Sequence, residues 1–196
     1  GIRDTLSDAA DIQVVGEAGD YGELRSLMRK EPCDVLVLDI NLPGRSGLDM
    51  LHALKDEGSP VKVLVVSMYP EDQYAIRALR GGAYGYVNKG GDPQVIVQAV
   101  RTVAQGRKYV TPEIAQMLVE SLTAPAPEQP HQRLSDRELQ TLLMIASGKR
   151  LSDIASELML SPKTVSVYRA RVLEKLGLAN NSELTVYAIR NGLVGE

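Results

Sequence analysis

Three side chains in the first half of the sequence have the chemistry to accept and hold a phosphoryl group. Asp39, Ser67 and Lys89 each lie at or just after the end of a short apolar run. An aspartate can attack phosphorus and hold an acyl phosphate, a lysine neutralises phosphate charge, and a hydroxyl can hydrogen-bond a phosphoryl oxygen. A lone Asp after a strand is more often a turn or helix-capping residue, so the inference depends on all three side chains meeting.

The apolar runs around these residues predict a parallel sheet. Strand-like and helix-like segments alternate along the first half, which predicts right-handed βαβ units and a doubly wound sheet of the α/β class. In such sheets ligands bind at the carboxyl ends of the strands, where Asp39, Ser67 and Lys89 fall. The predicted strands are 13–16, 34–38, 61–66 and 84–87, and the predicted helices are 21–30, 47–56, 70–80 and 92–105.

The second half has helical periodicity only, and a linker separates it from the first. Residues 123–133 contain three prolines, which hold a chain extended. Ser135 with Glu138 predicts a capping box, and Ser161 before Pro162 predicts a second helix start. Two short helices with a tight turn, the second of them basic, form the shape that places one helix in the DNA major groove. The predicted helices are about 135–146, 151–158, 162–176 and 182–191.

The overall composition is that of a globular protein. Hydrophobic residues make up 44% and charged residues 24%, which is too apolar for a disordered chain. No apolar run reaches the roughly 18 residues that a membrane span needs, no secretory signal pattern opens the sequence, and the single cysteine, Cys33, allows no internal disulfide. We therefore expect a cytoplasmic protein with no membrane partner. His52 and His131 have no partner nearby in sequence and are expected to be solvated or capping residues.

Positive charge gathers in one segment of the second half. The net charge is −3, but residues 131–196 carry nine Lys and Arg against seven Asp and Glu, and four of the nine lie in 163–175. Such a stripe indicates nucleic acid binding better than the overall charge does, although a solvated helix face would also explain it. At 100° per residue the helix 162–176 turns Val165 and Val172 inward and Arg169 toward the buried side. Its outward face carries Lys163, Ser166, Val167, Ala170 and Glu174.

The first half resembles the receiver domain of two-component response regulators. By that resemblance Asp39 is the phosphoacceptor, Ser67 the switch hydroxyl and Lys89 the lysine of the family's site. Tyr86 is the aromatic residue that changes rotamer, and Mg²⁺ is bound by Asp39 and the backbone carbonyl of Asn41. The implied fold is a flavodoxin-like doubly wound parallel sheet. The segments that carry the resemblance are DVLVLDINLPGRSG (34–47), VVSMY (65–69) and GAYGYVNKG (82–90).

The sequence departs from the receiver pattern at two places. Gly90 follows Lys89, where many receivers have a proline. Receivers also open with a strand that ends in two acidic residues that bind Mg²⁺, whereas residues 1–10 read as the middle of the helix that follows this strand. We therefore expect an N-terminally incomplete receiver whose first strand is missing from this chain and in which Asp39 alone holds Mg²⁺ poorly.

The second half resembles the LuxR/FixJ-type DNA-binding domain, an all-α fold of four helices with a helix-turn-helix. The resemblance is carried by LSDRELQTLLMIASGKRLSDIASELMLSPKTVSVYRARVLEKLGL. Tyr168 stands where this family often has histidine. The residues implied to contact the DNA backbone are Lys163, Thr164, Arg169, Arg171 and Lys175, and those that match base-reading positions are Ser166, Val167 and Ala170.

The two resemblances together imply a response regulator of the NarL/FixJ class. Its expected parts are a receiver domain at 1–106, a linker at 107–132 with a helix at 111–122, and the helix-turn-helix domain at 133–196. We expect a phosphorylation-controlled, sequence-specific transcription regulator that takes its phosphoryl group from a sensor histidine kinase and binds a double-stranded DNA operator. The receiver would transfer the phosphoryl group to itself and would not be a metabolic enzyme.

Two alternatives and one assembly prediction accompany this interpretation. A regulator of the same family could work without phosphorylation, and an α/β phosphatase or phosphotransferase would explain residues 1–130, although such an enzyme needs no helix-turn-helix. A single helix-turn-helix reads few bases, so we expect a homodimer. Leu184, Tyr187 and Ala188 share one face of the last helix and could pair two domains, or could pack onto the core of their own domain.

Overall fold

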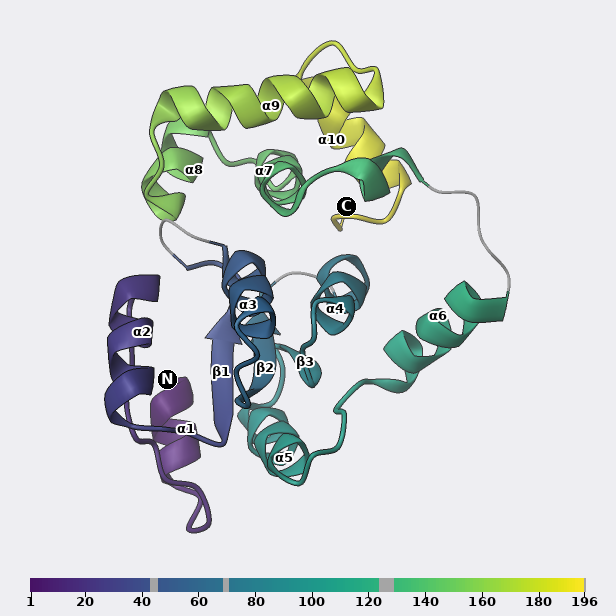
Figure 1. Cartoon of the computed structure of the whole chain (residues 1–196). Helices are drawn as coiled ribbons and strands as arrows, with labels where there is room; N and C mark the ends of the chain where they lie inside the picture. The colour runs from purple at the N-terminus through teal and green to yellow at the C-terminus, as the bar shows by residue number, and fades with distance from the viewer. Residues whose placement is uncertain (43–45, 69–70, 124–128, 196) are drawn as a thin grey trace. The chain divides into compact units, whose positions relative to one another are not determined.

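The computed structural model describes residues 1–42, 46–68, 71–123 and 129–195. It divides into two compact units, residues 1–120 and residues 121–196. The first holds a parallel sheet with helices, and the second is helical (Figure 1). The start of the helix predicted at 70–80 and the first two linker prolines, at 125 and 127, lie outside the described residues. None of the helices in the described ranges is long and apolar enough to cross a membrane.

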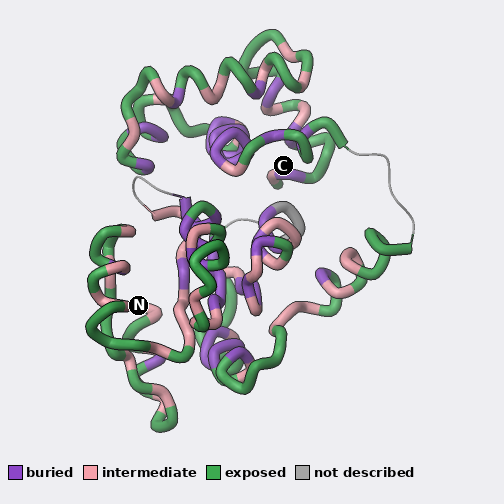
Figure 2. The backbone as a smooth tube through the Cα atoms, viewed as in Figure 1, coloured by how far each residue is buried: buried purple, intermediate pink, exposed green. Residues whose placement is uncertain are grey.

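The described part of the first unit contains a sheet of three parallel strands in the order β1-β2-β3. β2 is buried along nearly its whole length, because Leu64 and Val66 face one side and Val63 and Val65 the other, all at 3% exposure or less. In Figure 2 the strands are buried or half-buried, whereas α2 is mostly exposed or half-buried. The strands are β1 (Val35–Asp39), β2 (Lys62–Ser67) and β3 (Gly85–Asn88).

Helices pack on this sheet and position the strand ends. α1 and α5 contact each other and enclose one core with the sheet, into which Leu6 and Val103 point. α4 contacts β3 and α3. The helices are α1 (Ile2–Ser7), α2 (Tyr21–Lys30), α3 (Gly47–Asp56), α4 (Glu71–Arg80) and α5 (Pro93–Ala104), followed by α6 (Pro112–Thr123). The alternation read from the sequence therefore predicted the α/β class correctly.

The predicted strand at 13–16 was wrong. Residues 12–18 have no regular secondary structure, although Ile12 and Val14 still pack against the core. In the flavodoxin-like order 2-1-3-4-5 this segment would pair with the first strand, and the described residues contain no strand before β1 with which it could pair. For the same reason β1 is an edge strand here, and Val35 and Val37 are only half-buried.

The second unit is built on α7, which contacts α9 and α10, while α8 packs against α9. Leu142, Ile154, Val165 and Leu184 bring one fully buried side chain from each of the four helices to the common core. The elements are the 3₁₀ helix η1 (Pro130–Arg133), α7 (Asp136–Ala146), α8 (Leu151–Leu158), α9 (Pro162–Leu176) and α10 (Asn181–Arg190). The four predicted helices agree with these bounds to within about one residue.

Local signals in the sequence set these helix ends. Ser135 and Glu138 form the capping box at the start of α7, and Ser161 caps α9, accepting a hydrogen bond from the Thr164 amide. α9 ends at Gly177, which has a positive φ of 67°, the conformation that favours glycine. α8 ends at Met159 in the same left-handed region, with a φ of 51°.

Candidate functional site

Asp39 and Lys89 meet at the carboxyl ends of the strands. β1 and β2 pair with Asp39 opposite Val66, and the Lys89 amide donates to the Ser67 carbonyl at 2.8 Å, so the residues after β3 lie beside the ends of the other two strands. Lys89 Nζ donates to Asp39 Oδ2, and the Asn41 amide donates to Asp39 Oδ1 at 2.9 Å. The side chains of Asp39 and Lys89 are 29% and 27% exposed, so the carboxylate is held in place yet open to a small reactant.

Ser67 and Tyr86 belong to the same sheet but are fully buried. Ser67 ends β2 opposite Asn88, and Tyr86 is on β3 opposite Val65; both are 0% exposed. A hydroxyl or a ring enclosed in this way can respond to a phosphoryl group only if its surroundings rearrange. The structure therefore brings Asp39 and Lys89 into direct contact. It keeps Ser67 and Tyr86 in the interior.

Gly47 is a residue of this site that the sequence analysis missed. A Cβ at Gly47 would lie 2.5 Å from the Asp39 carbonyl oxygen and 2.8 Å from the Ile40 Cα, closer than real Cβ contacts. Its amide donates to the Ile40 carbonyl at 3.0 Å. The glycine thus lets the start of α3 pack directly against the end of β1. The available signal was a glycine at the first residue of a helical pattern, which is too common to be specific.

The described residues supply part of a Mg²⁺ site. Mg²⁺ prefers octahedral coordination by oxygen atoms, often from carboxylates and phosphates. Asp39 and the Asn41 carbonyl are donors of this kind, but the groups of three or more His, Cys, Asp or Glu that the described residues bring together do not include Asp39. The donor set of the described residues is therefore incomplete for Mg²⁺.

The outward face of α9 carries the predicted DNA-reading residues. Ser166, Val167 and Ala170 are exposed, whereas Val165 and Val172 are buried at 0%. Lys163 and Arg171 are also exposed, and neither forms an ion pair or a side-chain hydrogen bond within the described part of the chain. Thr164 is half-buried, with its hydroxyl 2.8 Å from Ser161 Oγ in the cap of the helix.

Two predicted backbone contacts are engaged inside the unit instead. Arg169 Nε donates to Asn181 Oδ1. Lys175 Nζ donates to Glu138 Oε1 at 2.5 Å. Burial alone raises the pKa of Glu138, but the hydrogen bonds from Lys175 and Ser135 outweigh burial and hold the pKa below its ordinary value.

The last helix offers a different surface from the one predicted. Leu184 and Ala188 are 0% exposed in a helix that packs on α7, so these two belong to the unit's own core and the expectation that they pair two domains was wrong. Tyr187 is half-buried, with its Oη 2.9 Å from His131 Nδ1. His131 is 8% exposed, which corrects the expectation of a solvated or capping histidine.

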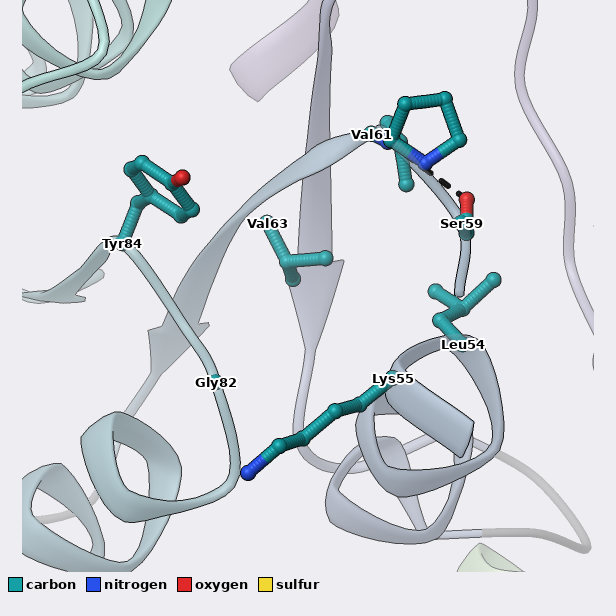
Figure 3. Close-up of a pocket in the computed structure, with 8 residues that line it drawn as sticks. Leu54, Lys55, Ser59, Val61, Val63, Gly82 and Tyr84 are labelled. Atoms are coloured by element: carbon teal, nitrogen blue, oxygen red, sulfur yellow. Dashed lines mark hydrogen bonds between the residues drawn. The ribbon is translucent and has the colours of Figure 1, made fainter. Parts of the chain in front are cut away.

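A small cavity of about 230 Å³ lies at the opposite ends of the strands. Val61 and Val63 line it near the start of β2, and Tyr84 lines it just before β3 (Figure 3). Lys55 extends along it to the Arg80 carbonyl at 3.5 Å. Because it opens at the amino ends of the strands, this cavity is separate from the Asp39 site.

Comparison with protein families assigns both units. Residues 1–101 match the response regulator receiver domain, and residues 132–188 match the luxR family of bacterial regulatory proteins.

Curated relatives match along nearly the whole chain. The chain is 38% identical over 195 residues to the response regulator GacA of Pseudomonas aeruginosa, covering 99% of this chain and 91% of the relative. It is 38% identical over 194 residues to the response regulator UvrY of Escherichia coli, covering 98% and 89%.

Solved structures of response regulators are similar to this chain over most of its length. RcsB from Salmonella enterica serovar Typhimurium, bound to the promoter rprA in the presence of the phosphomimetic BeF₃⁻, is similar with a TM-score of 0.61 and 27% identity, over 95% of this chain and 90% of that one. A structure of two RcsB dimers bound to two parallel DNAs is similar with a TM-score of 0.56 and 26% identity, over 95% and 89%.

Proposed function

Because the chain belongs to the two-component response regulators that join a receiver domain to a luxR-type DNA-binding domain, we propose that Asp39 is its phosphoacceptor and α9 its DNA-reading helix. The observation that carries the proposal is the contact of the Lys89 ammonium with the Asp39 carboxylate at the strand ends. The proposed parts are a receiver at 1–106, a linker at 107–132 and a DNA-binding domain at 133–196. The compact units 1–120 and 121–196 support this division.

Asp39 has the exposure and the partners that a nucleophile needs. In the proposed step a carboxylate oxygen of Asp39 bonds to phosphorus while the P–N bond of a phosphohistidine donor breaks, and the imidazole leaves with the electron pair. Lys89 and the Asn41 amide already face the two carboxylate oxygens and hold the group in position. Receiver domains bind Mg²⁺ for phosphorylation; the ion supplies positive charge to the phosphoryl oxygens, and Asp39 and the Asn41 carbonyl are the ligands this sequence contributes.

Ser67, Tyr86 and Lys89 are proposed to respond to the new phosphoryl group. The Ser67 hydroxyl would donate to a phosphoryl oxygen, Lys89 would exchange its carboxylate partner for the phosphoryl group, and Tyr86 would change rotamer. The phosphoryl group stays on Asp39, so the receiver acts as a switch and not as a metabolic enzyme. A phosphotransfer enzyme of another class is disfavoured because it would leave the second unit without a role.

The second unit is proposed to read DNA with the exposed face of α9. Ser166, Val167 and Ala170 are short and uncharged, so they allow close approach to base edges. Lys163, Thr164 and Arg171 are proposed as phosphate contacts. Arg169 would contact the DNA backbone only after its hydrogen bond to Asn181 breaks.

The protein is proposed to bind DNA as a homodimer, like the RcsB dimers on DNA. On α10 the exposed apolar side chains are Val186 and Ile189, at 46% and 38% exposure. They flank Tyr187, which is the one predicted dimer residue not enclosed in the core. We expect Val186→Ser with Ile189→Ser to weaken dimerisation without unfolding the unit, which sedimentation measures.

Selection of bound duplexes from a random-sequence pool tests the DNA-binding proposal. The chain should enrich a common motif, and Val167→Ala should cost about 1–3 kcal/mol on that duplex and little on a scrambled one. Arg171→Ala should weaken both duplexes and lower the salt slope by about one. Failure to enrich any motif, or equal losses on both duplexes for Val167→Ala, would contradict α9 as the reading helix.

A further inference from the structure

The carboxyl end of α9 is attached to the start of α7 by one ion pair. Lys175 lies in the last turn of α9 and Glu138 in the first turn of α7, with Nζ and Oε1 2.5 Å apart. The two partners differ in exposure, because the Glu138 side chain is 3% exposed and the Lys175 side chain 41%. The carboxylate is therefore the group that depends on its partner.

Glu138 has no freedom to leave this arrangement. Its amide donates to Ser135 Oγ at 3.2 Å, and its Oε1 accepts from the Ser135 amide at 2.9 Å as well as from Lys175. A buried carboxylate is costly unless it is paired and hydrogen-bonded. Lys175 thus neutralises a charge that the capping box has fixed in place.

The same region is where the chain enters the second unit. η1 (Pro130–Arg133) contacts α9, and Ser135 follows it after a single residue. In addition to its core packing on α7, α9 therefore contacts the entering segment through η1 and the first turn of α7 through the pair Glu138–Lys175. A displacement of residues 130–135 would be passed to α9.

We propose that Lys175 is a positioning residue that fixes α9 through Glu138 and does not act as a contact to the DNA backbone. The proposal rests on the DNA-reading role proposed for α9 above. Ser166 lies about 14 Å along the helix axis from Lys175, at 1.5 Å per residue. A small tilt about the fixed end therefore moves the reading face by an amount that matters for contacts to base edges.

Charge-removing variants on the same helix separate positioning from phosphate contact. Lys175→Gln is compared with Lys163→Gln, because Lys163 is exposed on α9 and has no ion pair among the described residues. The probes are a duplex selected by the wild-type chain from a random pool and a scrambled duplex of the same composition. Dissociation constants are measured for the full chain at several salt concentrations, below the unfolding temperature of every variant.

We expect Lys163→Gln to weaken binding to both duplexes and to lower the salt slope by about one. Lys175→Gln should weaken the selected duplex about tenfold, change the scrambled duplex little and leave the salt slope unchanged. Lys175→Arg should keep the selectivity, because arginine keeps a positive charge beside the Glu138 carboxylate. Glu138→Gln with Lys175→Gln should be no worse than Lys175→Gln alone, since the two residues act as a pair.

Two results would overturn the proposal. A salt slope lowered by about one in Lys175→Gln, with equal losses on both duplexes, would make Lys175 a phosphate contact. Unchanged binding to both duplexes, despite a lower unfolding temperature, would make the pair purely structural. If the wild-type chain enriches no motif at all, the proposed function itself fails, and that outcome is distinct from the other two.

Discussion

Both units of the molecule contain a lysine on a carboxylate, and the two pairs differ in burial. In the first unit Asp39 and Lys89 are 29% and 27% exposed, whereas in the second Glu138 is 3% exposed beneath Lys175. A pair whose two members are both reached by solvent contributes less and opens at lower cost, while a buried carboxylate that loses its partner is costly. The same kind of ion pair can therefore exchange partners in the receiver, whereas in the DNA-binding unit it fixes α9 to α7.

The largest expected effect is the loss of phosphorylation when Asp39 of the pair Asp39–Lys89 is replaced. Asp39→Asn should abolish phosphoryl incorporation, because an amide is not a nucleophile for phosphorus. Intact-mass analysis after incubation with acetyl phosphate and Mg²⁺ measures it, with Asp49→Asn, an exposed position on α3, as the matched control. The wild-type chain should react more slowly than a receiver that has two further acidic Mg²⁺ ligands, since Asp39 is in no cluster of carboxylates among the described residues.

Efficient labelling of wild type and Asp39→Asn alike would place the acceptor elsewhere. An unlabelled wild-type chain that still enriches a DNA motif would favour the alternative of a regulator that works without phosphorylation.

The next prediction compares how much the pairs Glu138–Lys175 and Asp39–Lys89 contribute to the free energy of unfolding. Lys175→Met should lower the free energy of unfolding of the second unit by about 1–3 kcal/mol, because Glu138 loses a charged partner while buried. Lys89→Met should change the first unit by less than about 1 kcal/mol. Hydrogen exchange of the α7 and α9 amides, compared with those of β1 to β3, reads the two units separately. Equal losses in both units would remove the distinction drawn from burial.

The fold was predictable because its signals are local. Alternating apolar runs predict β1, β2 and β3, and the serines at 135 and 161 cap α7 and α9 as expected. The strand at 13–16 failed because pairing depends on a neighbouring strand, which a pattern within the segment does not report. Gly47 was missed for the same kind of reason, since only the packed structure shows that a Cβ there would strike the end of β1.

The candidate sites were predictable in part. Spacing placed Asp39 and Lys89 at the carboxyl ends of β1 and β3, the two strands that pair with β2, and their side chains touch. The helical projection of α9 at 100° per residue separated exposed from buried residues. It could not show that Lys175 reaches Glu138, 37 residues away in sequence. The face of Leu184 and Ala188 was correctly periodic, yet periodicity does not reveal whether the partner is another chain or α7.

The stability of the second unit should depend on pH through the pair Glu138–Lys175. The pKa of Glu138 is below its ordinary value in the folded chain, so its stabilising contribution is present above the ordinary carboxyl range and is lost as the pH falls through the folded pKa. Unfolding of the second unit followed from neutral to acid pH should show this loss, and Glu138→Gln should flatten it. Asp11→Asn is the control, since the pair of Asp11 with Arg101 is exposed in the first unit.

Lys175→Gln sharpens the same test. Removing the ammonium should raise the pKa of Glu138, because burial then acts without its main opposing partner, and the loss of stability should begin at a higher pH than in the wild-type chain. A profile that is the same in Glu138→Gln, Lys175→Gln and wild type would mean that other carboxyls set the acid limit.

The smallest expected effect concerns how the helix-turn-helix is held at its turn. α8 and α9 both end in the left-handed region, at Met159 with a φ of 51° and at Gly177 with a φ of 67°. That conformation is strained for a residue with a Cβ and free for glycine. Met159 is 71% exposed, so its side chain contributes little packing. Met159→Gly should therefore stabilise the second unit by about 0.5–1 kcal/mol, and Gly177→Ala should destabilise it by a similar amount. Urea unfolding followed by circular dichroism measures both. A loss of stability in Met159→Gly would show that the methionine packs at the turn.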